Sequence, residues 1–270
     1  MPELPEVETV RRDLAVMLPG AVVTAAVVHG VRSARRDPTG FAAAMAGRTL
    51  VSFGRWGKYL LIGLAPGDDV LVVHLRMSGQ LLVVPADAQA PKHTHVVLAF
   101  ADGRELRFVD PRTFGEMFVT SAQMPELAAL GPDALGLDAD GLRTVLAGRR
   151  SRLKPLLLDQ RAIAGIGNIY SDEILFRAGL RWSRVAGALR PIEIRRLHSA
   201  MAGVLSDAVE RRGSSLRDAQ YVDVSGRPGT FQEEHAVYGR VGQPCVRCGR
   251  PIERITVAQR SHYWCRACQR

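Results

Sequence analysis

The sequence predicts an α+β protein with more than one domain: a β-rich N-terminal part, a helical middle and a small C-terminal hairpin. Three observations support this prediction. Segments rich in Val and Leu, separated by Gly, Pro and Asp turns, fill residues 21–120. Helical periodicity follows over residues 138–212, and all four cysteines lie in the last 26 residues. Several strands at this spacing indicate a β-sandwich or barrel, with flanking helices.

The first segment, MPELPEVETVRR, has two interpretations. Residues 5–18 fit a helix that ends at a Pro-Gly pair, and acidic residues suit its positive end. One face of that helix carries Val7, Val10, Leu14 and Leu18. The second interpretation is that loss of Met1 exposes the secondary amine of Pro2 beside the carboxylates of Glu3 and Glu6.

Changes in composition and the placement of Pro and Gly residues predict three domains, over residues 1–130, 131–235 and 236–270. A short helix is expected within residues 38–47. Residues 213–230 are polar and Gly-rich and predict a long loop, which is usually functional or mobile.

The charge balance predicts a polyanionic partner. Lys+Arg 36 against Asp+Glu 27 gives a net charge of +9 and a pI near 10.0. Nucleic acid is the first expectation and an anionic membrane the second; the alternative is a basic protein without such a partner. No secretory signal or membrane-length apolar stretch is present, so we expect a cytoplasmic protein with no membrane segment. No heptad pattern is present, and we expect a monomer.

Two Cys-x-x-Cys pairs, CVRC and CRAC, are separated by sixteen residues near the C-terminus. The pairs consist of Cys245, Cys248, Cys265 and Cys268. Four thiolates at this spacing fit one structural Zn²⁺ held by two knuckles and a hairpin. The alternative, a redox pair, needs only one such motif. Arg260 and two further arginines on the hairpin are suited to contact DNA.

Three other stretches carry polar or wedge-like residues between apolar segments. Gly165, Gly167 and Asn168 precede a helix and fit a phosphate clamp, although most such turns only connect helices. Lys58 lies in an apolar strand pattern, where it is either an edge-strand gatekeeper or a phosphate-binding cation. Taken singly, Met77 and Phe114 are more typical of a core. Because they lie on turns, they and Arg112 also fit a wedge that enters a base stack.

Eight segments in this order resemble the bacterial formamidopyrimidine-DNA glycosylase family: MPELPEVETVRR, GKYLL, HLRMSG, KHTHV, DPRTFG, GIGNIYSDEILF, YGRVGQPC and AQRSHYWC. The resemblance spans essentially the whole chain. It implies an N-terminal β-sandwich, a helix–two-turn–helix domain and a zinc hairpin. It also implies removal of 8-oxoguanine and ring-opened purines from damaged double-stranded DNA. The strand is then nicked by β,δ-elimination, as part of base excision repair.

The resemblance implies a role for each matched residue. Pro2, once Met1 is removed, is the nucleophile, Glu3 the proton donor that opens the sugar, and Glu6 a supporting carboxylate. Lys58 and Arg260 complete the catalytic set as phosphate-binding cations. The expected DNA contacts are His93, Arg112, Asn168, Lys154, Met77, Phe114 and Arg260. Residues 213–230 match the loop that closes over the extruded base.

Two other functions compete with this one. The first is an endonuclease VIII-like enzyme for oxidised pyrimidines, although the LPEVET opening and the wedge set fit the purine branch better. The second is a zinc-hairpin DNA-binding protein without catalysis. The joint presence of Pro2, Glu3 and Lys58 argues against it, since a decayed enzyme is expected to lose at least one of them.

Overall fold

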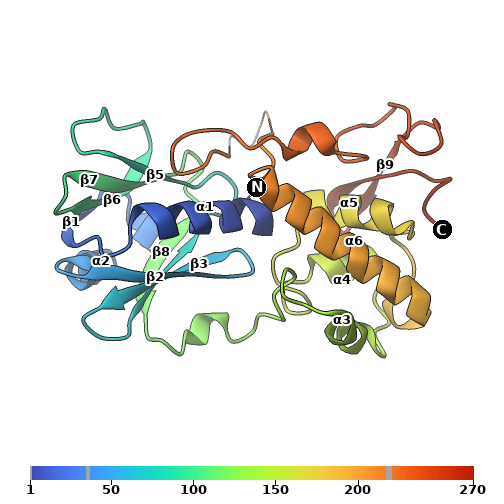
Figure 1. Cartoon of the computed structure of the whole chain (residues 1–270), viewed down its shortest axis with the longest axis horizontal. Helices are drawn as coiled ribbons and strands as arrows, with labels where there is room; N and C mark the ends of the chain where they lie inside the picture. Colours follow the sequence, from blue (N-terminus) through green and yellow to red (C-terminus); the bar gives the residue numbers. More distant parts are fainter. Residues whose placement is uncertain (1, 35–36, 217–220) are drawn as a thin grey trace. The chain divides into compact units, whose positions relative to one another are not determined.

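The computed structural model describes residues 2–34, 37–216 and 221–270, and it divides into two compact units (Figure 1). Unit 1 consists of Met1–Ala128 and Arg211–Thr230, and unit 2 of Ala129–Glu210 and Phe231–Arg270. The chain therefore leaves unit 1, builds most of unit 2, returns, and leaves again. This division joins residues 211–230 to the N-terminal unit, whereas the sequence prediction joined them to the helical domain. The division into three domains stays a prediction.

Unit 1 begins with α1 (Leu4–Met17), one residue earlier than predicted. The predicted apolar face is confirmed, because the four residues that define it are all at most 1% exposed and belong to one core. α1 packs against β2 (Thr49–Trp56), where Arg11 donates a hydrogen bond to the Phe53 carbonyl. Burial of an apolar stripe supplies most of the stability of a helix of this length.

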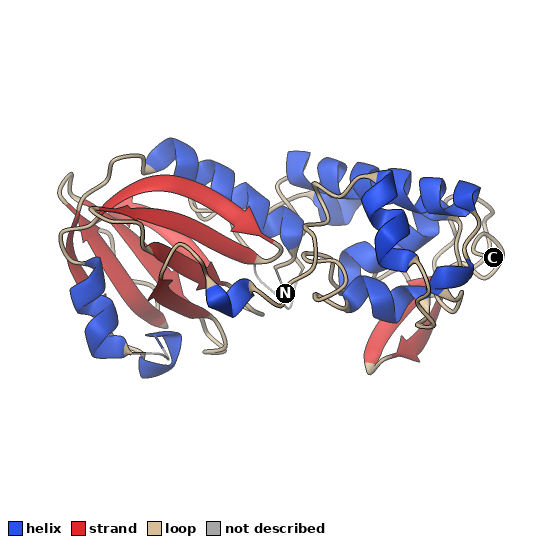
Figure 2. Ribbon diagram, turned by 90° about the horizontal axis from the view of Figure 1, so that it is seen from below, coloured by secondary structure: helices blue, strands red, loops and turns tan. Residues whose placement is uncertain are grey.

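Unit 1 contains two antiparallel four-stranded sheets, which confirms the predicted sandwich (Figure 2). One sheet has the order β1-β6-β7-β5 and the other β2-β3-β4-β8. The remaining strands are β1 (Val23–Val28), β3 (Tyr59–Ala65), β4 (Val70–His74), β5 (Gln80–Pro85), β6 (Thr94–Phe100), β7 (Arg104–Val109) and β8 (Glu116–Thr120). Burial alternates strictly along β3, as expected for a strand with one face on the core.

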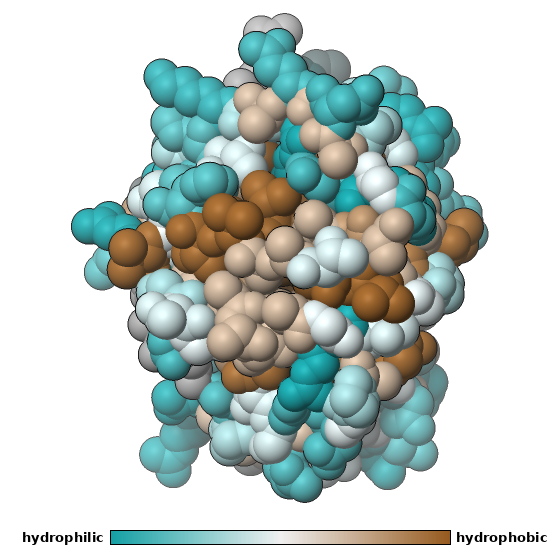
Figure 3. All heavy atoms as spheres, turned by 90° about the vertical axis from the view of Figure 1, so that its left-hand side faces the viewer, coloured by the Kyte–Doolittle hydropathy of each residue, from teal (hydrophilic) through white to brown (hydrophobic). Residues whose placement is uncertain are grey.

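The predicted short helix is α2 (Pro38–Met45), capped by Asp37, whose carboxylate accepts a hydrogen bond from the Gly40 N–H at 2.8 Å. The described residues also form short 3₁₀ turns: η1 (Val31–Ala34), η2 (Pro125–Leu127), η3 (Ala186–Ala188) and η4 (Phe231–Glu234). Figure 3 shows one end of the molecule, on which apolar side chains gather across the middle and polar side chains surround them. The expected monomeric state stays a prediction.

Residues 213–230, predicted as a loop, contain no helix or strand among the residues described there, and the preceding helix ends at Glu210. The segment is anchored to unit 1 by ion pairs. Arg212 contacts Asp13 of α1 at 2.5 Å and Asp223 at 2.7 Å. Asp223, 1% exposed, also accepts hydrogen bonds from two backbone N–H groups of its own turn. These bonds explain why the segment belongs with α1.

Unit 2 is helical, with a two-stranded hairpin, as predicted. Its helices are α3 (Ala139–Leu146), α4 (Leu153–Leu158), α5 (Asn168–Ala178) and α6 (Pro191–Glu210), and its strands are β9 (Glu253–Val257) and β10 (Arg260–Trp264). α5 packs against both α6 and β10. Within the described residues, no helix combines the length and the apolar character needed to cross a membrane.

Candidate active site and nucleic-acid contacts

The N-terminal residues are buried at the start of α1. Pro2 is buried, and Glu3, the N-cap of the helix, is 1% exposed. Glu3 and Glu6 form a capping box, in which the Glu6 carboxylate accepts a 2.7 Å hydrogen bond from the Glu3 backbone N–H. The proline of the first helical turn is Pro5, and Pro2 lies outside the helix. The helix-start interpretation is therefore correct for the two glutamates.

Glu6 also joins α1 to the segment that follows residue 210. Its second carboxylate oxygen accepts a 2.7 Å hydrogen bond from the Ser214 N–H, and its carbonyl accepts one from the Tyr221 hydroxyl at 3.3 Å. Gly213 has φ +80°, and a Cβ there would lie 2.7 Å from the Glu6 side chain. Burial, and then the Glu6 charge, raise the pKa of Tyr221 well above 10, so its hydroxyl stays a donor.

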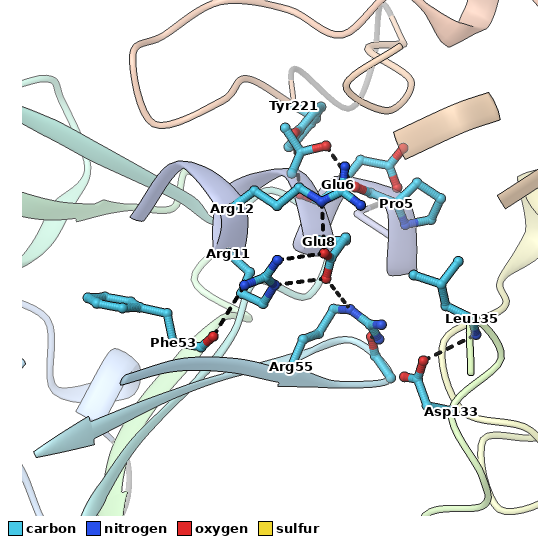
Figure 4. Close-up of polar contacts among 12 residues, drawn as sticks. Pro5, Glu6, Glu8, Arg11, Arg12, Phe53, Arg55, Asp133, Leu135 and Tyr221 are labelled. Atoms are coloured by element: carbon cyan, nitrogen blue, oxygen red, sulfur yellow. Dashed lines mark hydrogen bonds and ion pairs between the residues drawn. The ribbon is translucent and has the colours of Figure 1, made fainter. Parts of the chain in front are cut away.

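Glu8, one turn further along α1, binds three arginines (Figure 4). Its carboxylate accepts hydrogen bonds from Arg11 at 2.8 Å and from Arg12 and Arg55 at 3.0 Å each. Burial opposes the charge, but the hydrogen bonds from the arginines outweigh it and lower the pKa of Glu8 to about 2. Arg55 also donates to the Gly57 carbonyl at 3.0 Å. This bridge connects α1 to the turn that carries Lys58, and sequence reasoning missed it.

Lys58 lies in the two-residue turn between β2 and β3, where Trp56 pairs with Tyr59. The side chain is 7% exposed. The edge-strand interpretation is therefore wrong, because the residue lies outside the strands. Burial, followed by repulsion from Arg76 and Lys58, lowers the pKa of nearby His74 to about 3. His74 is therefore neutral at physiological pH and adds no second cation beside Lys58.

The predicted wedge residues lie on two turns of unit 1. Met77 is partly buried, whereas Arg112 is exposed and Phe114 is 42% exposed. The Arg112 guanidinium lies 5.4 Å from the centre of the Phe114 ring, a cation–π contact. The exposure of Phe114 excludes a core role for it, and the two side chains are presented together at the surface.

Asp110, which sequence reasoning did not single out, holds both wedge turns in place. It is 0% exposed. Its carboxylate accepts hydrogen bonds from the Ser78 hydroxyl at 2.5 Å and from the backbone N–H groups of Arg112 and Gly115 at 3.2 and 2.7 Å. One buried carboxylate therefore fixes Ser78, which follows Met77, and Arg112 and Gly115, which lie before and after Phe114. Its only sequence signal is its position just before the PRTFG turn.

Backbone strain surrounds Asp110. Arg76, His93 and Thr113 have φ of 54°, 68° and 57°, a region that L-residues other than Asn and Asp adopt rarely. The His93 carbonyl accepts a hydrogen bond from the Asp110 N–H at 3.0 Å. Strained residues of this kind cluster at functional sites, where the surrounding structure holds them. His93 itself is exposed, and its predicted DNA contact stays a prediction.

In unit 2, Asn168 is the first residue of α5, and the N-cap is Gly167. Asn168 therefore does not cap the helix. Its side-chain amide instead donates a 3.0 Å hydrogen bond to the Ser261 carbonyl of β10. Its Oδ1 atom is buried without a hydrogen-bond partner among the described residues. Asn168 thus links the helix start to the hairpin that carries Arg260, which is exposed at its tip.

Lys154 does not lie where a DNA contact requires it. Its side chain is 0% exposed and its ammonium is bound to Asp172 of α5. The same carboxylate binds His262 Nδ1 at 2.5 Å and accepts a hydrogen bond from the Tyr263 N–H at 2.9 Å. Lys154 therefore takes part in a buried network that attaches α4 and α5 to β10. This position contradicts the predicted phosphate contact, because a fully buried ammonium cannot reach DNA in this conformation.

The four cysteines come together at one point of unit 2. Their sulfur atoms all lie within 4.8 Å of one another, and the Cys245–Cys268 and Cys248–Cys265 pairs are 3.9 and 3.5 Å apart. Four sulfurs bound tetrahedrally to zinc at about 2.3 Å lie about 3.8 Å apart, so the donor set fits this ion. A redox role for one Cys-x-x-Cys pair does not explain why the two pairs come together. Such a closed site is structural.

A sandwich that buries an N-terminal Pro-Glu pair, joined to a helical unit with a four-cysteine hairpin, defines a zinc-containing DNA glycosylase with a helix–two-turn–helix region. Residues 1–117 match the family description "Formamidopyrimidine-DNA glycosylase N-terminal domain", and residues 130–220 match "Formamidopyrimidine-DNA glycosylase H2TH domain". Residues 242–270 match "Zinc finger found in FPG and IleRS". The chain belongs to the formamidopyrimidine-DNA glycosylase family.

Individual relatives agree with this assignment. The formamidopyrimidine-DNA glycosylase of Moorella thermoacetica is 47% identical over 94% of each chain, and that of Herpetosiphon aurantiacus is 46% identical over 100% of each. The crystal structure of MutM (FPG) from Thermus thermophilus superposes with a TM-score of 0.88 at 42% identity, covering 99% of this chain and 98% of that one. Lactococcus lactis Fpg bound to DNA with an abasic site gives 0.91 at 33% identity and 99% coverage of both.

Proposed function

We propose that the chain is a bifunctional DNA glycosylase and abasic-site lyase that excises 8-oxoguanine and formamidopyrimidines from double-stranded DNA in base excision repair. The observation that carries the proposal is the buried Pro2–Glu3 pair at the start of α1, in a chain of this family. The partner is damaged duplex DNA, and we expect the enzyme to act as a cytoplasmic monomer.

The chemistry begins at the Pro2 nitrogen, which becomes an amine when Met1 is removed; Met1 lies outside the described residues. An α-amino group has an ordinary pKa of about 8, so part of it is neutral near pH 7. The nitrogen lone pair attacks C1′ of the flipped nucleotide, and the bond from C1′ to the damaged base breaks. The departing base takes the electrons of that bond and the proton that the Pro2 nitrogen loses. Glu3 donates a proton to the sugar ring oxygen as the ring opens, which leaves an iminium ion between Pro2 and C1′.

The iminium explains why one site performs two reactions. A secondary amine gives an iminium with a fixed positive charge, and this charge acidifies the C2′ proton. Loss of that proton expels the 3′ phosphate by β-elimination, and a second elimination expels the 5′ phosphate. Hydrolysis of the remaining iminium then releases Pro2. Base removal and strand cleavage thus share one covalent intermediate.

The other residues bind and position the DNA. In this proposal Lys58, Asn168 and Arg260 bind phosphates near the lesion, where charge-assisted contacts are strong. A wedge formed by Met77, Arg112 and Phe114 fills the space left by the flipped base and offsets part of its unstacking cost. Residues 213–230 cover the extruded base, although residues 217–220 of this segment lie outside the described part of the chain. The zinc ion, held by the four cysteines, stabilises the hairpin and takes no part in a chemical step.

Borohydride trapping tests this proposal. The purified chain, shown by mass spectrometry to lack Met1, is reacted with duplexes that contain 8-oxoguanine opposite cytosine or thymine glycol. The thymine glycol arm is included because one solved structure of Lactococcus lactis FPG holds DNA with an oxidised pyrimidine. An adduct on the 8-oxoguanine duplex that Pro2→Gly greatly weakens supports the proposal. An adduct on thymine glycol alone would show that the enzyme acts on oxidised pyrimidines. The absence of an adduct on both duplexes would exclude this covalent route.

A further inference from the structure

Unit 2 contains a cavity of about 470 Å³ with an unusual lining. It lies where the C-terminal end of α5, the first turns of α6 and the cysteine knuckles meet. Six of the ten lining residues are arginines: Arg177, Arg184, Arg190, Arg196, Arg247 and Arg270. Glu193 is the one acidic residue among them. None of these residues has a role in the proposed reaction.

The charge of Glu193 is already neutralised within the cavity. Glu193 is 2% exposed and binds Arg184 through two hydrogen bonds of 3.0 and 3.1 Å. It also accepts a 2.8 Å hydrogen bond from the Arg190 N–H. Despite its burial, these hydrogen bonds lower the pKa of Glu193 to about 2, led by the Arg190 N–H. The carboxylate therefore stays ionised at neutral pH and offsets a single cation.

Asp207 pairs with Arg177 at 2.7 Å and offsets a second cation, and the other arginines keep a surplus of positive charge. Arg247 donates hydrogen bonds to the Phe176 and Arg177 carbonyls at 2.8 and 3.0 Å. These acceptors are neutral, so they hold the guanidinium in place without cancelling its charge. Arg196 and Arg270 have no side-chain hydrogen bond or ion pair with any other residue of the described chain. A zinc-bound set of four thiolates adds about two negative charges beside Cys268, which the surplus still exceeds.

Holding these guanidinium groups close together is energetically unfavourable unless a bound anion compensates their charge. Like charges held together repel, and guanidinium groups are the preferred donors for bidentate recognition of phosphate. The cavity also lies at the first turn of α6, a 20-residue helix, where the positive end of the helix dipole favours anions. The volume exceeds what one inorganic phosphate needs and suits a group with two or more phosphates.

We propose that this arginine-lined cavity is a second anion site, which binds a phosphate-bearing ligand. It is distinct from the predicted lesion contacts in unit 2, because Asn168 begins α5 and the cavity lies at the other end of that helix. An α-helix of 11 residues spans about 16 Å. The ligand is either a free polyphosphate or the backbone of DNA beyond the lesion, and both offer the same chemistry.

Titration of the zinc-loaded full chain with inorganic pyrophosphate tests the site. The variant is Arg196→Glu with Arg270→Glu. The control is Arg143→Glu with Arg150→Glu, which makes the same charge change at exposed positions of unit 2 away from the cavity. Calorimetry at low salt is expected to show binding to the parent chain, weakened at least tenfold in the variant and less than twofold in the control.

A second arm separates the two ligand sources. Affinity for an undamaged duplex is measured over a range of salt concentrations. If DNA occupies the cavity, the variant lowers the slope of log affinity against log salt by about two, since each lost phosphate contact contributes about 0.9. If a free polyphosphate occupies it, only pyrophosphate binding changes. Equal losses in variant and control, or neither pyrophosphate binding nor a slope change, would overturn the proposal.

Discussion

Two buried carboxylates, Glu8 in unit 1 and Asp172 in unit 2, each bind several cationic or polar groups, and the two sites differ in their charge balance. In unit 1, Glu8 faces three arginines, one of them 54% exposed, so positive charge is in excess and solvent is close. In unit 2, Asp172 is shared by Lys154 and His262, all of them 0% exposed. The first arrangement joins α1 to the turn that carries Lys58, and the second is an attachment point inside the fold.

The difference has energetic consequences. An ion pair with access to solvent can exchange a lost partner for water, whereas a fully buried charge that loses its partner costs several kcal/mol. We therefore expect unit 2, whose hairpin also depends on a metal, to be the more fragile unit. Unit 1 rests on a continuous apolar core formed by both sheets and α1.

The largest effect is expected from loss of the metal. The apolar core around the knuckles is small, with Phe176, Val237 and Ile252 beside two of the cysteines. Cys245→Ser should therefore unfold residues 242–270 and lower DNA affinity about 100-fold, because metal binding and folding of such sites are one process. Hydrogen exchange and zinc content measure this. Val246→Ala, at a 64% exposed position in the same knuckle, is the control. Protection of the hairpin in the zinc-free variant would contradict the prediction.

Lys154→Met is expected to destabilise the chain by about 3–5 kcal/mol, because the Asp172 carboxylate loses its buried ammonium partner. Urea unfolding monitored by circular dichroism measures the loss. Adding Asp172→Asn should recover part of it, since the unpaired charge is then gone. Lys92→Met, at an exposed lysine, should change stability by less than about 0.5 kcal/mol. A loss below 1 kcal/mol in Lys154→Met would show that the network is dispensable.

Lowering the pH should destabilise unit 1, because Glu8 becomes protonated. Its pKa is about 2 in the folded chain against an ordinary value of 4.5, so its stabilising contribution is present above pH 4.5. That contribution, about 3 kcal/mol from the size of the shift, is lost as the pH falls from about 4.5 to 2. Glu8→Gln should flatten the dependence of the unfolding free energy on pH in this window. Asp140→Asn, at an 82% exposed side chain, serves as the control and should leave the curve unchanged.

The smallest change in stability, about 1–2 kcal/mol, is expected from Asp110→Asn, because an amide can still accept some of the hydrogen bonds. Its effect on function should be more specific. Release of 8-oxoguanine in single-turnover assays should slow, while cleavage at a preformed abasic site, which needs no intact base to be extruded, should be nearly unchanged. Asp102→Asn, in an exposed turn of the same unit, is the control. Equal slowing of both reactions would contradict a role confined to the wedge turns.

The sequence predicted the features that depend on local patterns. The buried face of α1, the alternating strands and the four-cysteine hairpin follow from residue spacing and from metal chemistry. Helix boundaries differed by one residue at α1. The position of Pro2 outside the helix follows from the capping box between Glu3 and Glu6, which assigns the helix start to those residues.

Contacts between distant segments were not predictable from the sequence. Asp110 bonds to Ser78, 32 residues away, and Asp172 to His262, 90 residues away. Neither carboxylate stands out by spacing, because its partners are set by the fold. The sequence analysis predicts a DNA contact for Lys154, yet residue type alone does not distinguish a ligand-binding ammonium from one buried against a carboxylate. The return of residues 211–230 to unit 1 depends on long-range ion pairs of the same kind.

The central claim is that the Pro2 nitrogen forms the covalent intermediate, and peptide mapping of the trapped complex tests it most directly. The borohydride-reduced adduct with 8-oxoguanine DNA is digested with nuclease and trypsin and analysed by mass spectrometry. We predict that the sugar remnant is attached to the peptide of residues 2–11, on the Pro2 nitrogen. Attachment to a peptide that contains Lys58, or to either of the other two lysines, would contradict the claim.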